Sequence, residues 1–264
     1  MRPLERAIFE LERLEQRPAI DRINIAHIDG RAWLLSAILL LCFMLSLPST
    51  SLGPLLLYFL YPILLCAIVG ISYRKLLIQS FIVVPFAAVI GIFNPIINHH
   101  PALEFYGYTI SIGWVEWIVI MLRTWLSTQV AFLLLYAIGF QNICRALQRL
   151  GLPSLLILQL LFVYRYLTVL VQETLCMVRA REARSYGRKS YPLKHWSQFI
   201  GQLLLRTLLR AQHIHQAMIA RRFNGKIYNN STAGKWRWKE TLFISVWAFY
   251  FIIIRLYSNT LSAI

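Results

Sequence analysis

Five stretches of the chain are apolar enough to cross a lipid bilayer. A span needs about 20 predominantly apolar residues, and a helix satisfies every backbone hydrogen-bonding group from within the segment. The qualifying stretches are residues 33–47, 52–71, 76–97, 114–139 and 241–257. The pattern therefore predicts an all-α integral membrane protein with about five transmembrane helices.

Turn-forming residues divide this apolar region. The sequence PSTS at residues 48–51 favours a short turn, so the first two spans are predicted to form a helical hairpin. Pro85 interrupts the third span, and the Asn94-Pro95 pair closes it.

Residues 152–187 begin as apolar as a span but end in a run of arginines. Pro153 suits the first turn of a helix and Gly187 suits a helix end, so we predict one long helix, or two in line. Such a helix is roughly 50 Å long, whereas the hydrocarbon core is about 30 Å thick. We therefore expect it to lie partly along the inner membrane surface, with Arg165 buried against other helices.

A second helix is predicted over residues 194–223. Its apolar side chains recur mainly at three- and four-residue steps, and its basic side chains occupy the remaining arc, so we expect an amphipathic, interfacial helix. The chain then divides into an N-terminal cytoplasmic segment with four spans (1–139), a basic cytoplasmic helical region (140–240) and a final span (241–264).

Composition and charge support this arrangement. The chain is 58% hydrophobic and 14% charged, against about 25% charged residues in an average soluble domain. Basic residues accumulate on the cytoplasmic side of membrane proteins. The connections at 48–51 and 98–113 contain no lysine or arginine, whereas residues 140–240 contain seventeen. We therefore predict a multi-pass membrane protein with a cytoplasmic N-terminus.

The net charge of +16 requires an acidic counterpart, which is membrane lipid or an acidic partner protein. The basic helices are too apolar for a nucleic-acid-binding domain, so no nucleic acid is expected.

Candidate metal ligands do not gather into a site. The four cysteines are scattered without a CxxC pair and are expected to be packing residues, and the histidine pairs at 99–100 and 213/215 lack further ligands nearby. No DxxD, HxxxH or P-loop pattern occurs, which disfavours a membrane enzyme such as a lipid-modifying transferase. We therefore expect no catalytic residue, metal or cofactor in this chain.

The two predicted basic helices end alike, with ARSYG at residues 183–187 and ARRFNG at residues 220–225. Each end places an arginine after an alanine, and an aromatic residue and a glycine follow. A planar guanidinium at a helix end can bind a partner's carboxylate or carbonyl groups, and a small alanine permits close approach. Two such ends suit two similar docking sites.

Here the chain resembles the T component of energy-coupling-factor transporters, particularly the CbiQ-type subunits of cobalt and nickel uptake systems. The likeness covers most of the chain and also rests on HIDGR at residues 27–31, LP at 152–153 and YRY at 164–166. The resemblance implies two cytoplasmic coupling helices, each inserting such a motif into a groove on an ATPase subunit.

Carried over residue by residue, the resemblance makes Arg184 and Arg221 the anchoring arginines. Ser185 and Arg222 stand where the family usually has glycine or another small residue, so the second motif diverges more. The coupling residues that the resemblance implies are Ala183, Arg184, Ser185, Ala220, Arg221 and Arg222.

The resemblance also implies the partners. They are two ATP-binding cassette ATPase subunits, which bind ATP and Mg²⁺, and a separate substrate-binding membrane component. The chain itself would do no chemistry and would transmit ATPase motion to that component. Cobalt or nickel as cargo follows from likeness to the metal-uptake branch, and a vitamin importer stays open. A conventional ABC permease subunit is a further alternative, although residues 182–187 lack the Ile-x-Leu-Pro tail of that class.

Four other charged residues are structural or coupling candidates, and Arg165 is one of them. Asp29 and Arg31 precede the first span and could pair with each other, pair with the coupling helices or anchor the chain at the interface. Arg123 lies inside the fourth span, where ionisable residues usually face protein. Glu116 is two turns away, so we expect Arg123 to contact another helix instead.

Overall fold

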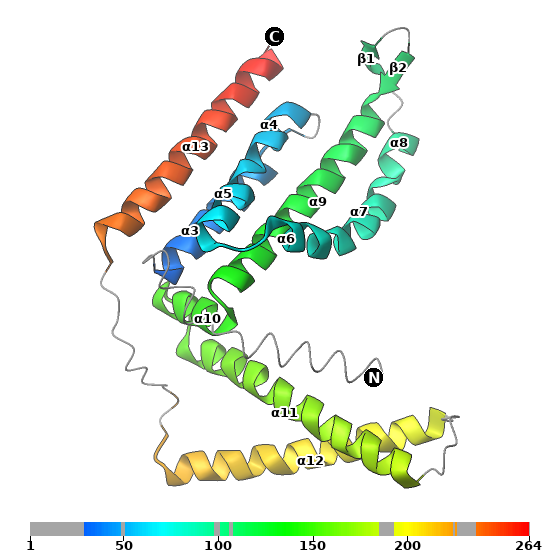
Figure 1. The fold of residues 1–264 in the computed structure, drawn as a ribbon, viewed down its shortest axis with the longest axis vertical. Helices are drawn as coiled ribbons and strands as arrows, with labels where there is room; N and C mark the ends of the chain where they lie inside the picture. Colours follow the sequence, from blue (N-terminus) through cyan, green and yellow to red (C-terminus); the bar gives the residue numbers. More distant parts are fainter. Residues whose placement is uncertain are drawn as a thin grey trace. The chain divides into compact units, whose positions relative to one another are not determined.

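The computed structural model describes residues 29–48, 51–97, 101–105, 108–184, 193–223, 225 and 236–263. Contacts divide its helices into two compact units (Figure 1). The membrane unit contains α3 to α10 together with α13, and the α11–α12 unit contains the two long helices that give it its name.

The membrane unit is helical except for one short hairpin. Its helices, in chain order, are α3 (Gly30–Leu45), α4 (Leu52–Tyr58), α5 (Leu60–Val69), α6 (Tyr73–Ser80), the 3-10 turn η1 (Phe81–Val83), α7 (Val84–Gly91), α8 (Phe93–Ile97), α9 (Ile112–Ala137), α10 (Phe140–Arg149) and α13 (Trp238–Ala263).

Five helical segments of the described residues are long and apolar enough to cross a membrane. Four lie in the membrane unit, at Leu52–Val69, Tyr73–Ile96, Ile112–Ala137 and Trp238–Thr260, and coincide with four predicted spans. The fifth is Ser154–Arg181, in the region for which the sequence predicts a helix partly along the surface. The predicted first span falls in α3, which is apolar but has only 16 residues. The helical, multi-span fold class is confirmed.

Prolines explain where the second and third spans are interrupted. A proline cannot donate a hydrogen bond to the carbonyl four residues earlier, and its ring clashes with that carbonyl. In each case the regular α-helix ends, or changes to a 3-10 turn, at that earlier residue. The pairs are Pro62 with Tyr58, Pro85 with Phe81 and Pro95 with Gly91.

An aromatic cluster joins the C-terminal helix α13 to the first helices of the unit. Tyr61 and Trp247 pack edge to face with ring centroids 4.6 Å apart, and Phe251 stacks on Tyr58 at 5.7 Å. The Tyr61 hydroxyl lies 2.9 Å from Ser36 Oγ on α3, so these two buried hydroxyl groups are paired. Burial of large rings supplies much of the packing energy that ties α3, α4, α5 and α13 together.

Helix α9, which has 26 residues, contacts α3 to α8. The Trp125 indole N–H donates to Ser80 Oγ at 2.9 Å and thereby fixes α9 against α6. A methyl group added at Gly113 would lie 2.6 Å from the Asn94 carbonyl oxygen. Glycine is therefore required where α9 passes the backbone of α8.

A short hairpin lies in the connection between α8 and α9, with β1 (Pro101–Phe105) antiparallel to β2 (Tyr108–Ser111). The sequence predicts no strand here, so the hairpin is an addition to the all-α expectation. Tyrosine, threonine and isoleucine in β2 favour extended backbone, which helical periodicity does not reveal.

The cysteines are free thiols that differ in burial. Cys66 and Cys144 are buried and fill the packing role expected of them, whereas Cys42 and Cys176 are exposed. Burial raises the pKa of the Cys144 thiol on α10, which keeps it protonated and inert.

The α11–α12 unit consists of α11 (Ser154–Arg184) and α12 (Leu193–Ala220). The first is continuous over 31 residues and begins directly after Pro153, as predicted for a single long helix. An ion pair between Arg206 and Glu173 joins the two helices, which cross in Figure 1. Only 6% of the apolar window Ser154–Arg181 is buried within the chain. Most side chains of α11 are therefore at least partly exposed.

Candidate coupling surface

The end of α11 carries the first predicted motif. Ala183 and Arg184 form the end of the helix, and both side chains are exposed. Arg181 and Arg184 lie in the last turn, where a positive charge interacts favourably with the negative end of the helix dipole. Ser185 lies outside the described residues.

The end of α12 carries the second motif and is closed by two backbone hydrogen bonds. The Phe223 N–H donates to the Met218 carbonyl at 3.0 Å, and the Arg222 N–H donates to the Ile219 carbonyl at 2.9 Å. This pair of bonds, with a left-handed residue between helix and loop, is the Schellman motif. Arg222 occupies the left-handed position, with φ of 52°.

This cap turns the chain so that the arginines remain outside the packed surface. Ala220, Arg221 and Arg222 are exposed, while Phe223 is half-buried. Phe223 and Met218 both line the groove between α11 and α12. No described residue accepts a side-chain hydrogen bond or forms an ion pair with Arg221, Arg222 or Arg184. All three guanidinium groups are thus available to an acidic partner.

The groove between α11 and α12 has a volume of about 1110 Å³ and is lined mainly by apolar side chains. Glu173, Arg206, Arg210 and His213 are polar residues on its wall. The described residues contain no group of three or more metal-ligating side chains, and His213 and His215 are exposed on α12. His99 and His100 lie outside the described residues.

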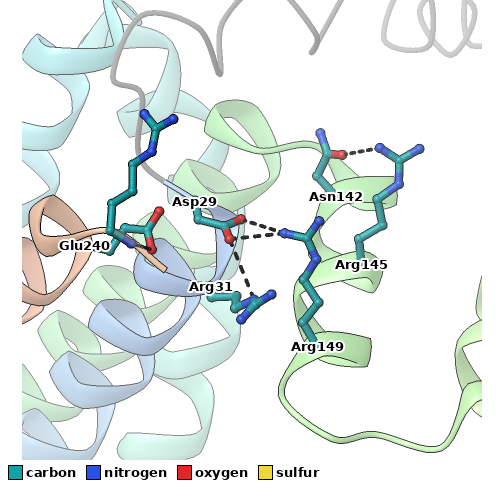
Figure 2. A network of polar contacts seen from close by, with 7 residues as sticks. Asp29, Arg31, Asn142, Arg145, Arg149 and Glu240 are labelled. Carbon is teal, nitrogen blue, oxygen red and sulfur yellow. Dashed lines mark hydrogen bonds and ion pairs between the residues drawn. The ribbon is translucent and has the colours of Figure 1, made fainter. Parts of the chain in front are cut away.

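A charged cluster forms where α3 begins beside the end of α10 (Figure 2). Asp29 accepts hydrogen bonds from Arg149 Nη1 at 3.1 and 3.3 Å, and Arg31 Nε lies 3.7 Å from the same carboxylate. The side chains of Asp29 and Arg149 are 17% and 26% exposed, so water screens the pair only in part.

Helix packing and helix dipoles explain why the carboxylate is held there. The start of α3 packs against α10, because a Cβ at Gly30 would be in ordinary van der Waals contact with the Ala146 side chain, at 3.7 Å. A carboxylate at the start of α3 and an arginine at the end of α10 each face a favourable dipole end. Of the alternatives left open for Asp29 and Arg31, the structure shows the ion pair between the two. The sequence pattern did not indicate Arg149 as a partner of Asp29, because the two residues are 120 positions apart and periodicity relates only neighbouring turns of one helix.

The Asp29–Arg149 pair is expected to stabilise the membrane unit by about 1 kcal/mol, because it is partly buried and hydrogen-bonded twice. The test is a double-mutant cycle of Asp29→Ala and Arg149→Ala, measured by thermal unfolding in detergent. A matched cycle of Asp29→Ala with Arg74→Ala, at an exposed arginine of α6, should be additive. Equal coupling in the two cycles would contradict a specific pair.

Comparison with known proteins identifies the family. The family described as CbiQ, cobalt transport protein, matches residues 24–232. The chain belongs to this family. The match covers the Asp29 cluster and both arginine-tipped helix ends, so these features lie within the CbiQ domain.

A characterised relative supports the same assignment. The nickel permease LarQ of Lactiplantibacillus plantarum is 33% identical over 106 residues, which are 40% of this chain. The match spans 38% of the length of LarQ. The family description names cobalt transport, so this chain belongs to a transport family.

Two further candidates of this CbiQ-family chain have contrasting surroundings. Arg123 on α9 donates to the Leu47 and Pro48 carbonyls at 2.8 and 2.7 Å. It therefore contacts the turn after α3, whereas contact with another helix was expected. Arg165, expected to be buried, is instead exposed on α11. The reason is that α11 packs against few residues of its own unit, so burial of Arg165 would require lipid or another surface.

Proposed function

We propose that this chain is the transmembrane coupling subunit of an energy-coupling-factor importer for cobalt or nickel. It would receive motion from two ATP-binding cassette ATPase subunits and transmit it to a separate substrate-binding membrane component. ATP and Mg²⁺ would be bound by the ATPases, and this chain would perform no catalysis. We place it in a bacterial inner membrane with a cytoplasmic N-terminus.

The observation that carries the proposal is the pair of exposed, arginine-tipped ends on α11 and α12. Each guanidinium offers a fork of donors that matches a carboxylate, and Arg184 and Arg221 have no acceptor of their own in the described residues. A long continuous helix can carry a displacement from its tip, because its hydrogen-bonded backbone resists bending. At 31 residues, α11 measures about 46 Å.

Charge and family membership add support. Residues 140–240 hold seventeen basic side chains but only three acidic ones, so an acidic groove would attract this region. Many of these residues would also interact with anionic lipid, at about 1 kcal/mol each near the surface. The CbiQ description names cobalt, and the description of LarQ names nickel, which favours a divalent metal over a vitamin as the cargo.

Co-purification tests the partnership. The affinity-tagged chain, expressed with its candidate ATPase and metal-capture subunits, is expected to retain both through size-exclusion chromatography. Cells that contain the complex should accumulate radiolabelled cobalt or nickel, and a Walker-lysine variant of the ATPase should not. Retention of no nucleotide-binding subunit, or metal accumulation without ATP hydrolysis, would refute the proposal.

A further inference from the structure

Three buried polar side-chain atoms on α4 and α13, two helices that pack together, have no hydrogen-bond partner among the described residues. They are Tyr58 Oη, Arg255 Nη1 and Ser258 Oγ. Tyr58 and Ser258 are buried as whole residues, whereas Arg255 is partly exposed. Buried polar atoms in native proteins nearly always have a partner, which is a protein group, a water or a ligand.

These three groups belong to one cluster. Ser258 lies three residues after Arg255, so both side chains are on the same face of α13. Phe251 is one turn earlier on that face and stacks on Tyr58, with ring centroids 5.7 Å apart. The positive charge of Arg255 acts on the Tyr58 hydroxyl across the same interface. One guanidinium group therefore accompanies two buried hydroxyl groups.

The helices around Arg255 supply no counter-charge. Helix α13 packs mainly against α3 and α4, and neither of these two helices contains an aspartate or a glutamate. The acidic residue of α13 is Glu240, which is 15 residues before Arg255 and therefore about 22 Å away along the helix. Arg255 forms no ion pair with a described residue. Because a charge within a membrane span is costly when unpaired, its counter-ion must come from outside these helices.

The position of Arg255 along α13 indicates which anion is within reach. Arg255 is five residues before the end of the apolar segment Trp238–Thr260, or about 7.5 Å along the helix. A long arginine side chain can extend from that depth to the lipid headgroups. Tyr257 is exposed two residues later, and tyrosine is enriched at the membrane–water interface. Leu56 and Leu256 are exposed as well, so lipid acyl chains have apolar surface on both helices.

We propose that Arg255, backed by the Tyr58 and Ser258 hydroxyl groups, forms a binding site for the phosphate of a membrane phospholipid. The buried Nη1 faces the protein, where the two hydroxyl oxygens are acceptors that orient the guanidinium. The partly exposed remainder of the side chain presents a fork of donors, which matches two phosphate oxygens. The bound lipid stabilises the packing of α13 on α4, and this role is independent of ATPase docking.

Native mass spectrometry and thermal unfolding of the detergent-solubilised chain test the site with three probes. Dioleoylphosphatidylglycerol carries a phosphate and two acyl chains, dioleoylglycerol lacks the phosphate, and inorganic phosphate lacks the chains. We expect the phospholipid to bind and to raise Tm, and the other two probes to leave Tm unchanged. An equal rise with dioleoylglycerol would show that acyl chains alone bind. An equal rise with inorganic phosphate would indicate a site for a free anion, and either result would overturn the proposal.

Arg255→Gln is expected to bind the tightest phosphatidylglycerol about tenfold more weakly, because a charge-assisted contact is lost. Arg255→Lys should retain part of the affinity, since it keeps the charge without the fork. Lys239→Gln is the control, because it removes an exposed positive charge at the other end of α13, and it should bind as the parent does. If Arg255→Gln binds the lipid as tightly as the parent, or if Lys239→Gln loses as much affinity, Arg255 is not a phosphate-binding residue.

Tyr58→Phe separates lipid binding from a purely structural role. Without lipid, this variant should be at least as stable as the parent, because an unpaired buried hydroxyl group is removed. With phosphatidylglycerol, its rise in Tm should be smaller than that of the parent, because the guanidinium loses an orienting acceptor. A lipid-dependent rise equal to that of the parent would exclude Tyr58 from the site.

Discussion

Replacing both Arg184 and Arg221 by glutamate is expected to reduce ATP-driven metal uptake to the background of cells without the transporter. Each change turns an attractive contact with an acidic groove into a repulsive one, and like-charge contacts at an interface cost several kcal/mol. Both side chains are exposed, so the changes create no buried charge and leave the fold intact. Membrane insertion should therefore be normal.

The measurement combines radiolabelled metal accumulation with co-purification of the ATPase subunits and quantification of the chain in membranes. The matched control is Lys75→Glu with Lys239→Glu, which makes the same change in net charge at two exposed residues of the membrane unit. This control should retain uptake and ATPase binding. If the Arg184/Arg221 variant still binds the ATPases and transports metal, neither arginine is a coupling residue.

The single variants add information about the mechanism. If both helix ends bind ATPase subunits, Arg184→Glu and Arg221→Glu should each weaken ATPase binding. The double variant should then lose more affinity than either single variant. A complete loss from one single variant and no effect from the other would indicate that one helix end carries the attachment alone.

Replacing Arg123 by methionine is expected to destabilise the membrane unit by about 2 to 3 kcal/mol, since two charge-assisted hydrogen bonds are lost. The Arg123 guanidinium donates to the Leu47 and Pro48 carbonyls beyond the end of α3, where no helical N–H is available to either. Methionine fills similar space without donors. The Leu47 carbonyl would then need water or another donor, whereas the Pro48 carbonyl would keep the hydrogen bond from the Ser51 hydroxyl at 2.9 Å.

Thermal unfolding in detergent tests this expectation, with a decrease in Tm on the order of 5 °C. Arg74→Met applies the same substitution to an exposed arginine of α6 and should leave Tm unchanged. Arg123→Lys should recover part of the loss, because an ammonium can reach one carbonyl but lacks the fork. An unchanged Tm for Arg123→Met would show that water replaces the guanidinium at no cost.

Much of the helical framework could be predicted from local sequence. The length of an apolar stretch indicates most of the spans, because unpaired backbone groups are excluded from lipid. Pro62, Pro85 and Pro95 each interrupt a regular helix four residues earlier, because proline lacks a backbone N–H. The duplicated Ala-Arg pattern likewise located the ends of α11 and α12, since helix-ending residues act within one turn.

The sequence by itself therefore determined the membrane setting, the long basic helices and the arginines at their ends, because these depend on contacts within a few residues. Only the tertiary structure decided that Asp29 pairs with Arg149 and that Arg123 binds the end of α3, because those partners lie 120 and about 75 residues away. It also decided that Arg222 adopts a left-handed backbone, since sequence pattern favours glycine there. Pairs of residues far apart in the sequence depend on how the helices pack. The pattern of residues along one helix does not indicate which other helix packs against it.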